Sequence, residues 1–122
     1  MPHLEQDSVC RLYGIKNCDT MKKAIAWLND HGIEYTFIDY KKTGVVASRL
    51  PHWNQAVGWD ALINRRGLTW RKLPQEARDP LDESRARELM ETHPTLIRRP
   101  VLERGTEVLV GFDADQYKAV LA

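Results

Sequence analysis

The sequence contains little cysteine and no long hydrophobic run, and each shortage excludes a class of protein. Only Cys10 and Cys18 stand among the 122 residues, so the chain is not a small domain held together by several disulfides. No stretch approaches the roughly 20 consecutive apolar residues of a transmembrane helix. Residues 1–7 are polar and lack the apolar segment of a signal peptide. We therefore expect a reduced, cytoplasmic protein that has no membrane partner.

An excess of charge of one sign is also missing. The chain has 18 Lys and Arg against 17 Asp and Glu, for a formal net charge of +1. Such a balance produces no strong field for binding nucleic acid or a membrane surface. The histidines lack the spacing of a metal site, and no glycine-rich phosphate-binding loop is present. We predict no bound metal, no bound cofactor and no direct nucleic-acid partner.

The order of sequence patterns indicates an α/β protein. Residue periodicity predicts strands over 9–15, 34–40, 100–103 and 107–112, and helices over 18–31, 48–57, 59–64, 69–73, 83–92 and from 114 to the end. A strand, a helix and a strand within about thirty residues are typical of a parallel βαβ unit. The complete order is βαβ, a helical insertion, then ββα.

This order is that of a thioredoxin-like fold, with a mixed four-stranded sheet and an insertion in the middle. A chain of 122 residues has the size of one domain with its own hydrophobic core. We predict a disordered tail over residues 1–8 and one domain over residues 9–122, with the helical insertion at about residues 45–92.

Cys18 stands where the first predicted helix begins. The first turn of a helix carries unpaired N–H groups and the positive end of the helix dipole, and both favour a thiolate. Lys16 adds positive charge, whereas Asp19 opposes it. A cysteine can instead act as a small buried residue, but Cys18 has no apolar neighbour within two positions. We interpret Cys18 as a catalytic nucleophile whose thiolate is stabilised by the N–H groups of Asp19 and Thr20.

No second cysteine is placed to resolve a disulfide on Cys18. In a C-x-x-C motif the second cysteine would occupy the position of Met21. Cys10 lies eight residues earlier along an extended chain, roughly 20 Å away at ~3.3 Å per residue, whereas a disulfide needs Cα atoms within ~7 Å. The sequence therefore predicts a monothiol site that uses an outside thiol, from glutathione or from another protein.

Two basic segments are candidates for binding an anion. Arg99 precedes Pro100, and in thioredoxin-type folds the proline at this point is cis and lies opposite the cysteine. Arg99 would then face the Cys18 thiolate with several donors, whereas Arg98 is an ordinary surface charge. The run Asn64-Arg65-Arg66-Gly67 is either a solvated turn or a segment that closes over an anionic substrate, and both interpretations stay open.

Three runs taken together resemble a known family. They are Tyr13-Gly14-Ile15-Lys16-Asn17-Cys18-Asp19-Thr20, Asn64-Arg65-Arg66-Gly67, and His93-Pro94 followed by Arg99-Pro100. From about residue 9 to residue 121 the chain resembles the arsenate reductase (ArsC) superfamily, and more closely its Spx/YffB-like branch. The resemblance implies an ArsC-like thioredoxin fold, cysteine redox chemistry and a glutathione-dependent monothiol reductase. Glutathione would be held by Arg99, Arg66 and Lys16, next to Asp19, Thr20 and Pro100.

The resemblance leaves two other activities open. One is arsenate reduction with glutathione or glutaredoxin, and the other is an Spx-like regulator that binds RNA polymerase without turnover. Arsenate reductases of this family carry a histidine where Gly14 stands and three arginines around the arsenate. Arg99 matches the second arginine, but Asn64 and the Val110–Gly111 region stand at the other two. Fewer cationic partners would hold an oxyanion more weakly.

Overall fold

The structure is a computed structural model that describes residues 9–16, 18–42 and 44–122. Contacts divide the chain into two compact units. The first contains the chain through Tyr40 together with Arg99–Ala122, and the second is Lys41–Arg98. The second unit corresponds to the predicted insertion and extends a few residues beyond it at both ends. The predicted tail over residues 1–8 lies outside the described residues.

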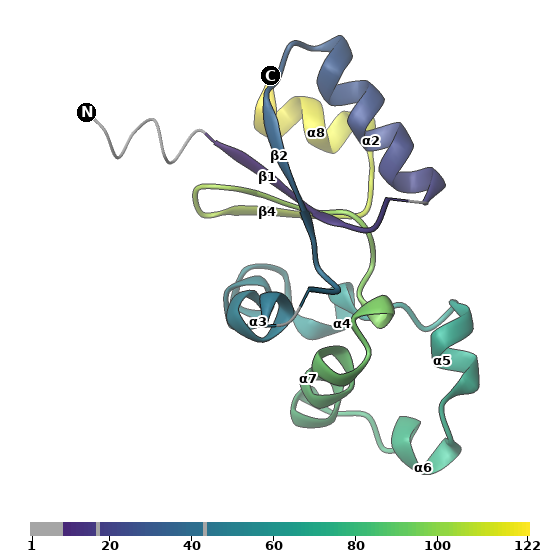
Figure 1. The fold of residues 1–122 in the computed structure, drawn as a ribbon. Coiled ribbons are helices and arrows are strands. Elements are labelled where there is room, and N and C mark those ends of the chain that lie inside the picture. Colours follow the sequence, from purple (N-terminus) through teal and green to yellow (C-terminus); the bar gives the residue numbers. More distant parts are fainter. Residues whose placement is uncertain (1–8, 17, 43) are drawn as a thin grey trace. The chain divides into compact units, whose positions relative to one another are not determined.

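The first unit is built on a mixed four-stranded sheet (Figure 1). Its strands are β1 (Cys10–Gly14), β2 (Tyr35–Asp39), β3 (Val101–Arg104) and β4 (Glu107–Val110), in the order β2-β1-β3-β4. β1 pairs with β2 in parallel, whereas β3 is antiparallel to both β1 and β4. The predicted βαβ and ββα segments and the thioredoxin-like α/β fold are confirmed.

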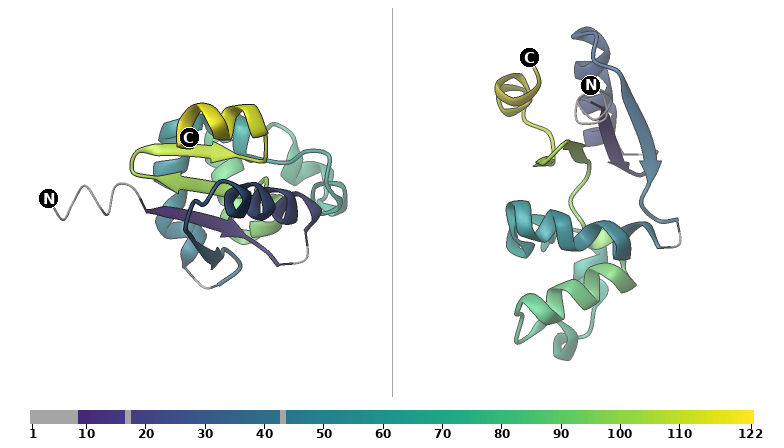
Figure 2. Two further views of the ribbon diagram at one scale, coloured as in Figure 1. Left: turned by 90° about the horizontal axis from the view of Figure 1, so that it is seen from above. Right: turned by 90° about the vertical axis from the view of Figure 1, so that its left-hand side faces the viewer.

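Helices α2 (Asp19–Asp30) and α8 (Ala114–Leu121) cover one face of this sheet (Figures 1 and 2). The core between them consists of Cys10, Leu12, Met21, Ala24, Leu28, Leu102, Leu109, Tyr117 and Leu121. The helical spacing of Met21, Ala24 and Leu28 places all three on the buried side of α2. Asp113 caps α8, because its carboxylate accepts the N–H of Asp115 at 2.9 Å.

The second unit is helical, as the insertion was predicted to be. Its elements are α3 (Val45–Val57), α4 (Trp59–Leu62), α5 (Leu68–Lys72), α6 (Gln75–Arg78), α7 (Glu83–Thr92) and the 3-10 helix η1 (Pro94–Leu96). The prediction that its first helix starts at Ser48 was wrong. The helix begins at Val45 after Gly44, which adopts a left-handed φ of 83°. The Ser48 hydroxyl therefore lies inside the helix and donates to the Val45 carbonyl at 2.9 Å.

Strand directions bring three distant segments to one edge of the first unit's sheet. Because β1 and β2 are parallel, both end at this edge, and β1 leads on to Cys18 whereas β2 leads directly into Tyr40. The Tyr40 N–H donates to the Gly14 carbonyl at 3.2 Å, which continues the pairing past the strands. β3 is antiparallel to β1, so it begins at the same edge, immediately after Arg99 and Pro100.

Candidate active site

Cys18 is the N-cap residue of α2. Its backbone is extended, with φ −142° and ψ 127°, and its carbonyl accepts the Lys22 N–H at 3.0 Å. This confirms that the helix begins at the cysteine. The side chain is half-buried and its thiol is free. A sulfur atom that is fixed to a helix start and still reachable from solvent has the placement of a nucleophile.

The surroundings of Cys18 favour the thiolate. Partial burial would raise the pKa of this thiol and is the largest single influence on it, but the net pKa lies below the ordinary value. The opposing contributions come from the backbone amides of Met21 and Thr20 and from the Arg99 guanidinium, which acts both as a hydrogen-bond donor and as a positive charge. These groups together outweigh the cost of removing the sulfur from water.

The amides that act on the sulfur differ from those predicted. An N-cap side chain faces the second and third N–H groups of its helix, not the first. The contributing amides are accordingly those of Thr20 and Met21, and the amide of Asp19 is not among them. No conventional capping hydrogen bond reaches the sulfur. The two amides therefore act through looser contacts than a capping hydrogen bond, together with the donation from Arg99.

Arg99 lies beside Cys18, as predicted. The Arg99–Pro100 peptide bond is cis, and Pro100 is buried at the start of β3. The guanidinium donates to the Cys18 sulfur, and its Nη1 donates to the Tyr40 hydroxyl at 3.1 Å. Arg98, in contrast, is exposed, as expected of a surface charge. The arginine next to the proline is thus held between a thiol and a phenol.

Tyr40 is a member of this site that the sequence analysis missed. Its side chain is fully buried, with 0% of its surface exposed. Burial raises the pKa of the Tyr40 phenol, which Arg99 opposes and the negative charges of Cys18 and Asp39 reinforce. An aromatic residue at the end of a strand is usually a core residue. No feature of the surrounding sequence distinguished Tyr40 from an ordinary core residue.

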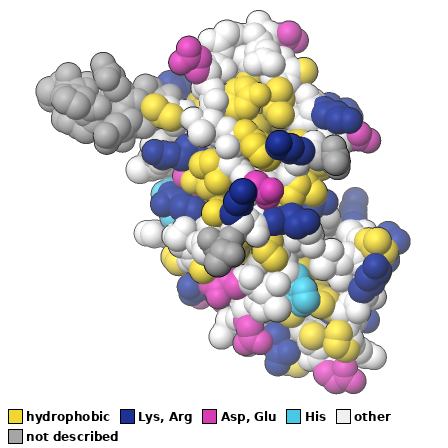
Figure 3. Space-filling model, viewed as in Figure 1, with side chains coloured by type: hydrophobic (Ala, Val, Ile, Leu, Met, Phe, Trp, Pro, Cys, Tyr) yellow, Lys and Arg dark blue, Asp and Glu magenta, His cyan; other side chains and the backbone are white. Residues whose placement is uncertain are grey.

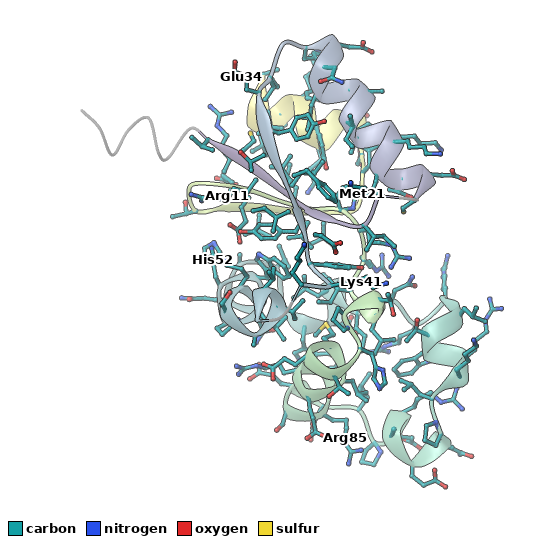
Figure 4. The ribbon with its side chains drawn as sticks, viewed as in Figure 1. Arg11, Met21, Glu34, Lys41, His52 and Arg85 are labelled. Carbon is teal, nitrogen blue, oxygen red and sulfur yellow. The ribbon has the colours of Figure 1, made fainter. Side chains whose placement is uncertain are left out.

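Met21, in the first turn of α2, packs against Gly14 at the end of β1. Met21 is 1% exposed, and it extends from the first turn of α2 toward the end of β1 (Figure 4). A Cβ atom built on Gly14 would lie 2.9 Å from Met21 Cε and closer still to Sδ. The methionine therefore occupies the space that any side chain at position 14 would need.

Cys10 differs from Cys18 both in its burial and in the direction in which its pKa is shifted. It is 1% exposed and belongs to the core under α2 and α8. Burial raises the pKa of its thiol, and the charge of Arg104 only partly opposes this. Both cysteines are free thiols. Cys10 therefore packs in the core from its place in β1.

The remaining predicted site residues are surface cations. Lys16 is exposed in the turn before Cys18. Arg66 is exposed in the second unit, where its N–H donates to the Asn64 side chain at 3.0 Å and its carbonyl accepts from Arg71. Arg65 pairs with Asp60 at 2.6 Å. The roles of Lys16 and Arg66 in holding an anion stay predictions.

Other kinds of site have no support among the described residues. They contain no group of three His, Cys, Asp or Glu side chains that could hold a metal ion. Nor does any helix in this part of the chain have the length and apolar character needed to cross a membrane. The face shown in Figure 3 mixes basic and acidic side chains, in keeping with the nearly balanced charge.

Comparison with known sequences finds relatives along nearly the whole chain. An uncharacterized protein of Haemophilus influenzae is 41% identical over 111 residues, which cover 91% of this chain and 97% of the relative. The global transcriptional regulator Spx of Streptococcus pneumoniae is 26% identical, over 86% of this chain and 80% of its own length.

Comparison with solved structures also finds proteins that are similar to this chain along nearly its whole length. The structure of a protein named YffB is 50% identical with a TM-score of 0.87, covering 93% of this chain and 99% of its own. An arsenate reductase (ArsC) related protein from Brucella melitensis is 53% identical with a TM-score of 0.74, covering 92% and 93%. The sequence profile of the ArsC family matches residues 13–120. This chain belongs to the ArsC family.

Proposed function

We propose that this protein is a glutathione-dependent monothiol reductase whose nucleophile is Cys18. The observation that carries the proposal is the half-buried Cys18 thiol at the start of α2, with its pKa lowered against burial by two helix amides and by Arg99. A thiolate is the reactive form of cysteine in disulfide exchange. ArsC-family membership is consistent with thiol redox chemistry at this position.

The reaction proceeds by two exchanges. The Cys18 thiolate attacks the glutathione sulfur of a mixed disulfide between glutathione and another thiol. The S–S bond breaks, the leaving thiolate takes a proton from solvent, and Cys18 carries a disulfide to glutathione. A second glutathione thiolate then attacks the glutathione sulfur of this adduct. Oxidised glutathione leaves and Cys18 is restored as a thiolate, so that one free glutathione thiol is consumed for each substrate thiol released.

The absence of a resolving thiol in the site favours this monothiol route. Met21 stands at the fourth position of the motif and is buried, and Cys10 is enclosed in the core with a raised pKa. Neither can release a substrate from Cys18. Arg99 supplies the positive charge next to the sulfur where an anionic thiol compound would bind, and we propose that Lys16 and Arg66 contribute further charge.

The test is the intact mass of the protein after incubation with oxidised glutathione. We expect the wild type to gain one glutathione adduct, which reduced glutathione removes again. Cys18→Ser should gain none, whereas Cys10→Ser should gain the adduct as the wild type does. A folded wild type that gains no adduct on Cys18 would rule out the glutathione mechanism.

An Spx-like regulator is the second candidate, and the observation that favours it is the similarity to Spx along 86% of this chain. A regulator requires a partner, RNA polymerase in the Spx-like case, and no turnover. Pull-down with purified RNA polymerase tests it directly. Binding that persists in Cys18→Ser, combined with no reductase turnover in the wild type, would favour the regulator.

Arsenate reduction has less structural support. The family's arsenate reductases carry a histidine at the position of Gly14, and here Met21 fills the space that such a side chain would need. A coupled assay with arsenate, glutathione and glutaredoxin would test this activity. Turnover that depends on Cys18 and on arsenate would establish it.

A further inference from the structure

Tyr40 is fully buried, yet its hydroxyl accepts a hydrogen bond from Arg99, the arginine that donates to Cys18. The bond from Arg99 Nη1 to the Tyr40 hydroxyl measures 3.1 Å and joins residues 59 positions apart. The same guanidinium donates to the Cys18 sulfur. Tyr40 itself belongs to the scaffold, because it directly follows β2 and its N–H pairs with Gly14 at the end of β1.

This arrangement restricts where the Arg99 guanidinium can lie. An arginine side chain has several rotatable bonds, and a half-exposed one turns toward water unless a partner holds it. The Tyr40 ring has 0% of its surface exposed, so its hydroxyl is a fixed acceptor. A guanidinium anchored at one nitrogen by a fixed acceptor keeps its remaining N–H groups aimed in constant directions.

A neutral acceptor also preserves the charge that Cys18 needs. Burial raises the pKa of the Tyr40 phenol, so the hydroxyl stays protonated while Cys18 is a thiolate. A carboxylate in the same place would neutralise the arginine and would repel the sulfur. The charge of Arg99 acts on both Cys18 and Tyr40, and the charges of Cys18 and Asp39 also act on Tyr40.

We propose that Tyr40 is a positioning residue, which holds the Arg99 guanidinium against the Cys18 sulfur and thereby sets the reactivity of that thiol. The inference deepens the proposed function and rests on it for its biological meaning. Thiol reactivity can nevertheless be measured without any glutathione turnover. In this role Tyr40 acts on the sulfur through Arg99, whose guanidinium it holds.

The test is the rate at which iodoacetamide alkylates Cys18 as a function of pH, followed on the Cys18 peptide by mass spectrometry. The variant is Tyr40→Phe, which removes one oxygen atom and keeps the buried ring. The matched control is Tyr117→Phe, because Tyr117 is also 0% exposed, lies in the same unit, and donates its hydroxyl to the Gly111 carbonyl at 3.2 Å. Thermal unfolding of each variant verifies that it is folded.

We expect the midpoint of the alkylation curve to move to higher pH in Tyr40→Phe. At a pH well below the wild-type midpoint, alkylation should slow by about 2- to 10-fold, the range of one net hydrogen bond. The rate at high pH should stay equal or rise slightly, since a more basic thiolate is intrinsically more nucleophilic. A merely structural role would not produce this pH-dependent pattern, and Tyr117→Phe should retain the wild-type curve.

A double-mutant cycle with Arg99→Met shows whether Tyr40 acts through the arginine. In the Arg99→Met background, Tyr40→Phe should change nothing further. A wild-type curve for Tyr40→Phe, or an equal slowing with and without Arg99, would overturn the inference. If Tyr40→Phe fails to fold, Arg99→Lys replaces it, since a lysine cannot bridge both groups with a planar fork. An unchanged Cys18 curve in Arg99→Lys would then overturn the inference.

The outcomes separate this inference from the proposed function. A wild-type Cys18 that alkylates like an ordinary thiol would contradict both. A reactive wild-type Cys18 that is unaffected by Tyr40→Phe would contradict the role of Tyr40 and leave the reductase proposal standing.

Discussion

Replacing Gly14 by alanine should destabilise the protein by inserting one methyl group into the space of Met21. The new Cβ would lie 2.9 Å from Met21 Cε and closer to Sδ, well inside the separation of about 3.5–4.0 Å at which carbon atoms attract. Met21 is 1% exposed, so it cannot turn outward into water. Overpacking of this kind costs typically ~1–3 kcal/mol.

The flexibility of methionine decides where in that range the cost falls. Only the end of the Met21 side chain has to move, and an unbranched thioether adapts better than a branched residue. We therefore expect Gly14→Ala to lower the free energy of unfolding by about 1–2 kcal/mol. Because Met21 is the cause, Met21→Ala should remove the clash. Met21→Ala alone should cost ~2–5 kcal/mol through the cavity that it leaves.

The assay is urea unfolding of the four proteins of this cycle, followed by circular dichroism. The double variant should be more stable than the sum of the single effects predicts, by about 1 kcal/mol, which exceeds the ~0.3–0.5 kcal/mol scatter of additive pairs. Leu28→Ala is the matched control, because Leu28 is buried on the same face of α2 but lies about 10 Å further along the helix. Its effect should add to that of Gly14→Ala. Strict additivity with Met21→Ala, or a neutral Gly14→Ala, would refute the reasoning.

Four further outcomes are expected. Arg99→Met should raise the pKa of Cys18, so that alkylation at neutral pH slows; an unchanged pH profile would mean that the helix amides alone hold the thiolate. Met21→Cys should divert Cys18 from a glutathione adduct to an internal disulfide, seen as a loss of two hydrogens in the intact mass instead of a gain of glutathione. Asp113→Ala should lower the free energy of unfolding by about 1 kcal/mol through loss of the α8 cap, and a change below ~0.3 kcal/mol would contradict the capping role. Burial raises the pKa of Cys10, so its contribution to stability is complete below the unfolded value of ~8.5 and is lost as pH rises above that value. Cys10→Val should flatten this fall in stability above about pH 8.5, and an unchanged slope would assign the fall to other groups.

The elements that carry the site could be predicted from local pattern. An apolar-rich run that ends at a turn marked β1, and aromatic and β-branched residues marked β2. The 3.6-residue spacing of Met21, Ala24 and Leu28 marked α2. The end of β1 and the start of α2 bracket Cys18, so its place at a helix start followed from the sequence alone. The start of α3 was misplaced because Ser48 is a common cap residue, whereas the turn is made by Gly44 in a left-handed conformation.

The partners of the thiolate were predicted less completely. The Arg99-Pro100 pair was expected opposite Cys18 from the order of the elements, and the cis bond and the donation from Arg99 agree with this. The choice of Met21 over Asp19 as an amide donor depended on the backbone of Cys18, whose extended ψ of 127° orients the side chain relative to the N–H groups that follow. The amino-acid sequence alone does not specify that backbone angle.

By itself the sequence determined the α/β order, the absence of a C-x-x-C motif and the helix start at Cys18, because these depend on neighbours within a few positions and on which residue types are present. Only the tertiary structure identified Tyr40, since its link to Arg99 spans 59 positions. That link exists because β1 and β2 end, and β3 begins, at the same edge of the sheet. Strand pairing thus brings together a thiol, a guanidinium and a buried phenol that nothing in their local sequences connects.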